Sequence, residues 1–176
     1  MSRVSKSHVL SRCRKQAKGF SLVEVLVVVL IILVIAAISL PHFNRARMMA
    51  NEASAVASIR AVQDAEAMYS STYPQIGFAG RLSDLGSHGT DCKSPSKTNA
   101  CLITDDLLVS GLKSGYTFDL VGDGNIPDHS YTLTATPISA DATGRCAFVG
   151  DQTGQIQTLT SNKSGHFAAS GGGCGS

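Results

Sequence analysis

The chain has 176 residues, a length typical of one domain or of one domain with an appendage. Hydrophobic residues make up 43% of it and charged residues 16%, a balance that argues against disorder. With no tryptophan and 6% aromatic residues, a large aromatic ligand pocket is not expected. The net charge of +2 is unevenly spread, because residues 1–19 hold six of the 15 Lys and Arg residues and no acid. Positive charge confined to one end is not the pattern of a general nucleic-acid binder.

An apolar segment, Phe20–Leu40, follows this basic end, and its only polar residues are Ser21, Glu24 and Ser39. As a helix it would be about 31 Å long, close to the roughly 30 Å hydrocarbon core of a bilayer. The basic residues before it place the N-terminus in the cytoplasm by the positive-inside rule. The sequence therefore predicts a single-pass membrane helix that precedes an exported part.

An ordinary signal peptide or signal anchor is the alternative interpretation of this segment. A secretory peptide has an apolar stretch of roughly 7–15 residues that ends at a small-residue cleavage site. Here the stretch is longer, and the small residue at a sharp boundary is Gly19, which lies before it. Glu24 also argues against this alternative, because a carboxylate in a membrane helix costs about 2.5–3.5 kcal/mol. Such a residue indicates a functional site and calls for a cationic partner.

Cleavage between Gly19 and Phe20 would supply that cation. The cut removes the basic leader and leaves an ammonium group on Phe20, about 6 Å along the helix axis from Glu24. The ammonium group of a neighbouring subunit comes closer if the helices pack in stagger. In an apolar bundle such a pair offsets the desolvation of both groups, and it sets the register of the helices.

The stretch Lys18–Val27, KGFSLVEVLV, resembles the processing site of type IV prepilins and type II secretion pseudopilins. In that family a membrane aspartyl peptidase cuts after the glycine and methylates the new N-terminal phenylalanine. The resemblance implies cleavage after Gly19, N-methylation of Phe20 and an assembly contact through Glu24. Pro41 matches the proline that ends the family's membrane segment, and a proline inside a helix is expected to kink it.

The resemblance covers roughly residues 12–45 and implies a structural subunit, not an enzyme. Such a subunit is held in the inner membrane and processed by the prepilin peptidase. Pilus or secretion assembly machinery then polymerises identical copies into a periplasmic or cell-surface filament. The apolar helix would be the membrane anchor before assembly and the filament core afterwards.

We expect a type IV pilin, and a type II secretion pseudopilin stays open as the alternative. The calcium-associated tryptophan motif of major secretion pseudopilins is absent, since the chain has no tryptophan. A membrane-anchored binding module that never polymerises also stays open, and it would need another partner for Glu24. No G-x-S-x-G, H-E-x-x-H, P-loop or G-x-G-x-x-G pattern supports an enzyme, and no cofactor is expected. The Lys and Arg residues after Arg47 are dispersed, which argues against nucleic acid as a partner.

The expected fold class is α+β and pilin-like, with a long N-terminal helix packed on a small antiparallel sheet. In chain order the predicted parts are a basic leader (1–19), a membrane and filament-core helix (20–41), an amphipathic helix (42–74), a loop region with a short helix (75–115), an antiparallel sheet (116–160) and a Gly/Ser-rich tail (161–176).

The second helix is predicted from an apolar stripe at helical spacing, made of Ala55, Ile59, Val62 and Tyr69. Glu52 and Glu66 interrupt this stripe. We expect the helix to pack on its own domain, with packing between subunits as the alternative. Tyr73-Pro74 should end it, because the residue before a proline is disfavoured in the α conformation.

After this helix the spacing of the hydrophobic residues changes. Thr104-Asp105-Asp106 predicts a short capped helix that stops near Gly111. An alternation of period two then predicts four strands at 116–121, 130–136, 145–149 and 155–160. Their short connections favour an antiparallel meander, one face of which the helix would cover. The tail should be flexible if nothing tethers it.

Loss of Cys13 with the leader would leave four cysteines, Cys92, Cys101, Cys146 and Cys174. An even number in an exported segment predicts disulfides, in one of three pairings. We favour Cys92–Cys101, which closes a short loop, and Cys146–Cys174, which pins the tail to a strand. Zinc is the alternative, but no C-x-x-C pair and no histidine cluster is present.

Four oxygen-bearing residues, Asp119, Asp123, Asn125 and Asp128, crowd one predicted turn. Calcium prefers such ligands, but the ligand spacing is not that of an EF-hand loop. Asp and Gly are also the residues that a tight hairpin needs. We therefore expect turn chemistry and no metal site here, with calcium as the alternative.

Overall fold

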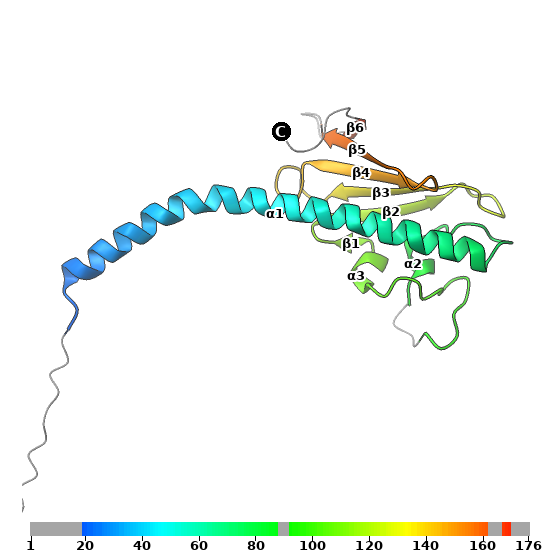
Figure 1. Ribbon diagram of the computed structural model, residues 1–176, viewed down its shortest axis with the longest axis horizontal. Helices are drawn as coiled ribbons and strands as arrows, with labels where there is room; N and C mark the ends of the chain where they lie inside the picture. Colours follow the sequence, from blue (N-terminus) through cyan, green and yellow to red (C-terminus); the bar gives the residue numbers. More distant parts are fainter. Residues whose placement is uncertain (1–18, 88–91, 162–166, 170–176) are drawn as a thin grey trace, which may run out of the picture. The chain divides into compact units, whose positions relative to one another are not determined.

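The computed structural model describes residues 19–87, 92–161 and 167–169. The chain divides at Pro41 into two compact units, residues 1–40 and 41–176. Helix α1 (Leu22–Thr72) begins in the first unit and ends in the second. The other described helices and all described strands belong to the second unit (Figure 1).

The second unit contains one antiparallel sheet. Its six strands lie in chain order and are β1 (Leu112–Lys113), β2 (Tyr116–Gly122), β3 (Tyr131–Pro137), β4 (Cys146–Asp151), β5 (Ile156–Ser161) and β6 (Phe167–Ala169). The pair of β2 and β3 sets Phe118 opposite Ala135 and Leu120 opposite Leu133. Strand neighbours in the chain are neighbours in the sheet, which is the expected consequence of short connections.

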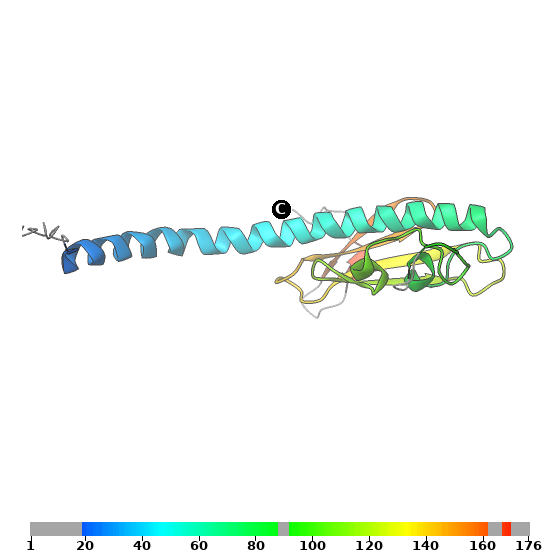
Figure 2. The same cartoon turned by 90° about the horizontal axis from the view of Figure 1, so that it is seen from below.

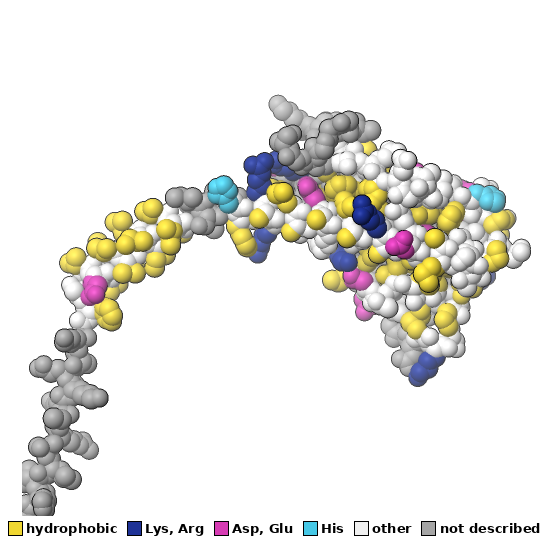
Figure 3. All heavy atoms as spheres, viewed as in Figure 1, with side chains coloured by type: hydrophobic (Ala, Val, Ile, Leu, Met, Phe, Trp, Pro, Cys, Tyr) yellow, Lys and Arg dark blue, Asp and Glu magenta, His cyan; other side chains and the backbone are white. Residues whose placement is uncertain are grey.

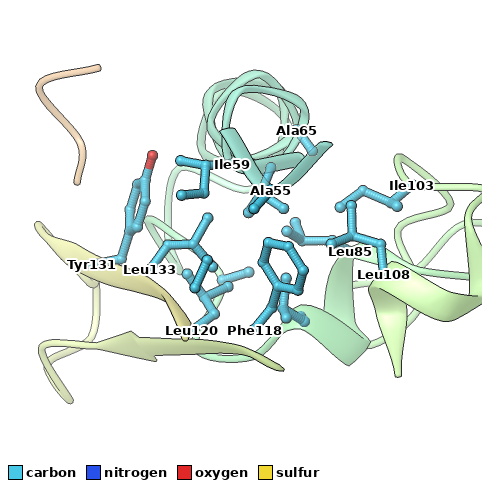
Figure 4. Packing of buried hydrophobic residues seen from close by; sticks show 14 of the residues in the cluster. Ala55, Ile59, Ala65, Leu85, Ile103, Leu108, Phe118, Leu120, Tyr131 and Leu133 are labelled. Carbon is cyan, nitrogen blue, oxygen red and sulfur yellow. The ribbon is translucent and has the colours of Figure 1, made fainter. Parts of the chain in front are cut away.

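One face of this sheet is covered by the C-terminal half of α1 (Figure 2). Burial alternates along β2, where Tyr116, Phe118 and Leu120 are buried and the residues between them are exposed. The predicted stripe faces these side chains, and its members are 0–2% exposed. Figure 4 shows Ile59 and Ala55 of α1 above Phe118, Leu120 and Leu133 of the sheet. The predicted α+β fold, with a long N-terminal helix on a small antiparallel sheet, is thus confirmed.

Two short helices close one end of this core. Helix α2 (Leu82–Leu85) contributes Leu82 and Leu85, and helix α3 (Asp106–Val109) contributes Leu108. The carboxylate of Asp105 caps α3 by accepting hydrogen bonds from the backbone N–H groups of Leu107 and Leu108, at 3.1 and 3.2 Å. This is the short capped helix that the sequence predicts.

Three elements were not predicted. Strand β1 and helix α2 are too short, at two and four residues, to produce a recognisable period. Strand β6 lies in the predicted tail, which was expected to be flexible only if nothing tethers it. It pairs with β5 so that Ala169 lies opposite Leu159, and backbone pairing of this kind needs no hydrophobic pattern.

The ends of α1 bear on two further predictions. The helix stops at Thr72, directly before Tyr73-Pro74. Pro41 lies within it, at the boundary of the two units. The kink expected at Pro41 concerns the orientation of one unit to the other and stays a prediction.

Candidate processing and assembly segment

The predicted cleavage site lies just outside the helix. Gly19, Phe20 and Ser21 precede α1, and the N–H groups of Glu24 and Val25 donate to the carbonyl of Ser21 at 3.1 and 3.2 Å. Phe20 is 81% exposed. The bond between Gly19 and Phe20 is therefore in non-helical, exposed backbone, which is the form a peptidase can bind.

Gly19 is not required by the packing of this chain. A Cβ atom built on it would meet no heavy atom within 4 Å, and its φ lies outside the left-handed region. The fold therefore gives no reason for glycine here.

Glu24 lies in the first turn of α1, with its side chain exposed. A carboxylate at a helix N-terminus is stabilised by the helix dipole. The backbone nitrogen that would become a free amine, if Phe20 is the mature terminus, lies two residues before this turn.

The apolar segment has no covered side in the described chain. Each large hydrophobic side chain described between Phe20 and Ile35 is between 48% and 81% exposed. Hydrophobic side chains accordingly cover the described first unit in Figure 3. A helix that is apolar all round requires an apolar environment, either lipid or other helices.

The length and hydropathy of the described helices bear on the predicted membrane span. Among the described residues no single helix has the length and hydropathy of a membrane span. Two consecutive helical stretches, Leu22–Ala37 and His42–Thr72, meet the criteria together as a broken pair.

Of the two predicted disulfides, one lies wholly within the described residues. Cys92 and Cys101 form a disulfide, the pairing that the sequence favours, with their Cα atoms 5.8 Å apart. Cys146 is 1% exposed on β4 and is disulfide-bonded. Cys174, the partner predicted for it, lies outside the described residues, as do Cys13 and the rest of the leader before Gly19.

Of the four candidate calcium ligands, Asp123, Asn125 and Asp128 interact with one another at the turn that follows β2. Asp119 is exposed on β2, on the face away from the helix. The carboxylate of Asp123 accepts hydrogen bonds from the N–H groups of Asn125 and His129, at 2.8 and 3.0 Å. The Asn125 bond is the main cause that holds the pKa of Asp123 well below its usual range. In the described part of the chain, no three His, Cys, Asp or Glu side chains are placed to hold a metal ion.

Asp128 has a structural place beside this turn. Its backbone N–H donates to the carbonyl of Ile76 at 2.7 Å, and its carbonyl accepts from the N–H of Phe78 at 3.2 Å. Burial, followed by the neighbouring Asp123, raises the pKa of its carboxyl group. Asp128 thus holds the loop between β2 and β3 against the segment that follows α1, and Asp123 holds the loop together internally.

Sequence reasoning missed one surface of the second unit. A groove runs along α1 beside strands β4 and β5, and its small residues are Ala53, Ala57 and Ala61. Their regular spacing of four was visible in the sequence. Its significance was not, because only the fold shows that these alanines line a groove beside β4 and β5.

Comparisons with known proteins agree with this geometry at the N-terminus. Residues 14–40 match the family model described as the prokaryotic N-terminal methylation motif. The comparisons with curated proteins and with solved structures gave no match. The matched residues include Gly19, Phe20 and Glu24, and they end with the apolar segment. Residues 14–40 of this chain are therefore the N-terminal methylation signature of type IV pilins and pseudopilins.

Proposed function

We propose that this protein is a structural subunit of a bacterial type IV pilus-like filament. It is made as an inner-membrane prepilin with a cytoplasmic N-terminus, cleaved after Gly19 and N-methylated on Phe20. It then polymerises through Phe20–Leu40 into a filament outside the inner membrane. Its partners are the prepilin peptidase, the assembly machinery and further copies of the chain.

One observation carries this proposal: an all-round apolar helix begins at Leu22, within a motif for N-terminal methylation. The motif covers residues 14–40, and the exposed side chains continue to Ile35. An anchor alone explains the apolar length but not the cleavage motif or the carboxylate of Glu24. A bundle of such helices explains all three, because it buries the apolar side chains and offers Glu24 a cation from a neighbour.

The motif supports a pilin-like or a pseudopilin subunit equally. We favour the pilus because the chain lacks any tryptophan, and so lacks the calcium-associated tryptophan motif of major secretion pseudopilins. In both cases the described head is a structural and contact domain, and the chemistry of processing belongs to the peptidase.

The first test is the N-terminal residue of protein sheared from the cell surface, determined by mass spectrometry. We expect N-methylated Phe20 in the sheared fraction. Methylated Phe20 that stays in the periplasm would support a pseudopilus instead. An intact Met1, or a cut beyond Leu40, would contradict both and indicate an ordinary anchor or a secreted domain.

The second test separates processing from assembly at Glu24. We expect Glu24→Ala to be cleaved and methylated normally but to form no filament, because the cation in the bundle loses its carboxylate. Val25→Ala is the matched control, since it trims the same turn without removing a charge, and it should assemble. Filament yield by shearing and immunoblotting measures both variants. Ordinary yield from Glu24→Ala would contradict the assembly role.

A further inference from the structure

The edge of β2 that faces away from β3 is only partly paired. Strand β1 covers this edge at Tyr116 and Thr117, although β2 runs on to Gly122. The N–H of Phe118 donates to the carbonyl of Gly111 at 2.7 Å on the same side. Beyond Phe118, no strand in the described part of the chain pairs with this edge.

Leu120 and Gly122 direct their backbone groups to the open edge. In a strand the N–H and C=O groups of successive residues point to opposite sides, so these two residues share the side of Phe118. The other side belongs to β3, where the N–H of Asp123 donates to the carbonyl of Ser130 at 3.1 Å. In the described chain, the hydrogen bonds outside paired strands include none to Leu120 or Gly122. Two donors and two acceptors therefore lie along this edge, in pairs about 7 Å apart.

A second groove, distinct from the one along α1, runs beside this edge. It holds about 470 Å³, a volume within the range of ligand sites in proteins. Its lining comes from residues 118–121 of β2, residues 80–83 at the start of α2 and residues 109–111 at the end of α3. Figure 1 shows both short helices on the β1 side of the sheet. The glycines at 80 and 111 carry no side chain, which leaves room for another backbone to approach β2.

Two unpaired charges line the groove. Arg81 and Asp119 are both exposed, and the ion pairs between described residues include neither. Asp119 lies on the outward face of β2 together with Val121, because side chains two residues apart in a strand share a face. A neighbouring strand is favoured if it sets a cation opposite Asp119 and an apolar side chain opposite Val121. A carboxylate on its other face would suit Arg81.

We propose that this groove binds an extended peptide segment of a partner protein, which adds as a strand to the edge of β2. One residue of the peptide exchanges both of its backbone hydrogen bonds with Leu120. Its two neighbours lie opposite Asp119 and Val121. Backbone hydrogen bonds supply the affinity in this mode of recognition, and alternate side chains supply the specificity.

The shape of the groove favours a single extended segment over the head of a second copy. The β2 edge of a second copy brings its own residues 80–83 and 109–111 with it, and these flank the edge on which pairing would have to occur. A lone strand brings no such flanks. The site lies wholly in the second unit, so it does not depend on the proposed filament.

A synthetic peptide tests the site on the full chain in detergent. The probe is the capped pentapeptide Thr-Val-Glu-Lys-Thr, which sets lysine opposite Asp119 and valine opposite Val121 in an antiparallel pairing. We expect saturable NMR shifts of the amide signals of Leu120 and Gly122 in the isotope-labelled chain. Hydrogen exchange at Leu120 should also slow, because its N–H gains an acceptor.

The matched control is the same peptide N-methylated on its central glutamate. It keeps every side chain but lacks the donor for the carbonyl of Leu120. We expect it to bind about tenfold more weakly, as the loss of one hydrogen bond to a desolvated carbonyl predicts.

A charge exchange tests the register of the bound strand. We expect Asp119→Lys to weaken binding of the probe about fivefold, because like charges then face each other across the two strands. The peptide Thr-Val-Glu-Glu-Thr should bind Asp119→Lys as the probe binds the unaltered chain. Asp64→Lys is the control, because Asp64 is an exposed acid of α1 that does not line this groove, and it should leave binding unchanged.

The outcomes decide between the occupants of the edge. Amide signals of Leu120 and Gly122 that do not respond to millimolar peptide would overturn the proposal, as would equal binding of the N-methylated peptide. Shifts that follow protein concentration without peptide would assign the edge to a second copy instead. If Asp119→Lys does not fold, the comparison of the two peptides still decides. Filament formation is not measured in these experiments, so their failure leaves the proposed function unaffected.

Discussion

Glu66 is the one charged side chain that lies in the core of the described residues, with no exposed surface. Its Oε2 accepts a hydrogen bond from the N–H of Ala79 at 2.8 Å, whereas its Oε1 has no hydrogen-bond partner there. Burial raises the pKa of Glu66 to about 8; the Ala79 bond opposes that shift, and Asp128 and Asp84 add to it. The side chain is therefore mostly protonated at neutral pH, and it ties α1 to the segment before α2.

This shift predicts how stability depends on pH. The pKa of Glu66 is about 8 in the folded chain against a reference value of 4.5, so the folded state holds the proton more tightly. The contribution of Glu66 to the free energy of unfolding is fully present below pH 4.5. It is lost as pH rises through about 8, and the total loss is roughly 5 kcal/mol. We expect Glu66→Gln to remove this loss, because the amide keeps an acceptor for Ala79 without a charge. Urea denaturation between pH 5 and 8.5 measures it.

The control for this measurement is Asp64→Asn, an exposed acid of the same helix. It should retain the pH dependence of the unaltered chain. If Glu66→Gln and the unaltered chain lose stability in parallel between pH 5 and 8.5, Glu66 is not the titrating group.

At the scale of elements, the contact between α1 and the sheet depends on one close approach. A Cβ atom on Gly150 of β4 would lie 2.7 Å from Cγ2 of Ile59, which has no exposed surface. It would also lie 3.0 Å from the amide nitrogen of Gln63. The amide of Gln63 donates to the carbonyl of Asp151 at 3.1 Å, so neither side chain is free to move away without loss. Glycine at this position lets the helix lie directly on the strand.

We therefore expect Gly150→Ala to destabilise the protein by about 1–3 kcal/mol, as overpacking of a core does. Thr132→Ala on the outward face of β3 is the control and should change the free energy of unfolding by less than about 0.5 kcal/mol. Chemical denaturation compares the two. Unchanged stability in Gly150→Ala would mean that α1 shifts along the sheet without cost.

At the scale of the whole molecule, the two units depend on different surroundings. The described core begins at Met48 and lies wholly in the second unit. The described first unit contributes no buried large side chain to it. Folding of the head and burial of the apolar helix are therefore separate events, one within the chain and one between the chain and its environment.

This separation predicts that a chain starting at Pro41 folds alone. It keeps every described core residue, so its thermal unfolding should be cooperative and within a few degrees of that of the full chain in detergent. A chain starting at Glu66 is the control, since it loses Ala55, Ile59 and Val62 and should not unfold cooperatively. Circular dichroism measures both. If the chain from Pro41 does not fold, the first unit contributes to the stability of the head.

Much of this protein was readable from its sequence, because the signals were local. The apolar run, the Gly-Phe junction and the offset of Glu24 lie within about twenty residues, and a family model recognises the same stretch. The buried stripe of α1, the strands β2–β5 and the cap of α3 followed from period and from residue type. Each of these depends on neighbours in the chain.

The remaining features were decided by tertiary structure, because they join residues far apart in the chain. Glu66 was read as an interruption of the apolar stripe, but Ala79 satisfies one of its oxygens and burial holds its proton. The alanines of α1 became one wall of a groove only when β4 and β5 were placed beside them. Local sequence determined which side chains α1 presents on each face. Packing determined which of those faces the sheet covers and which stays exposed, because that depends on distances that no local pattern contains.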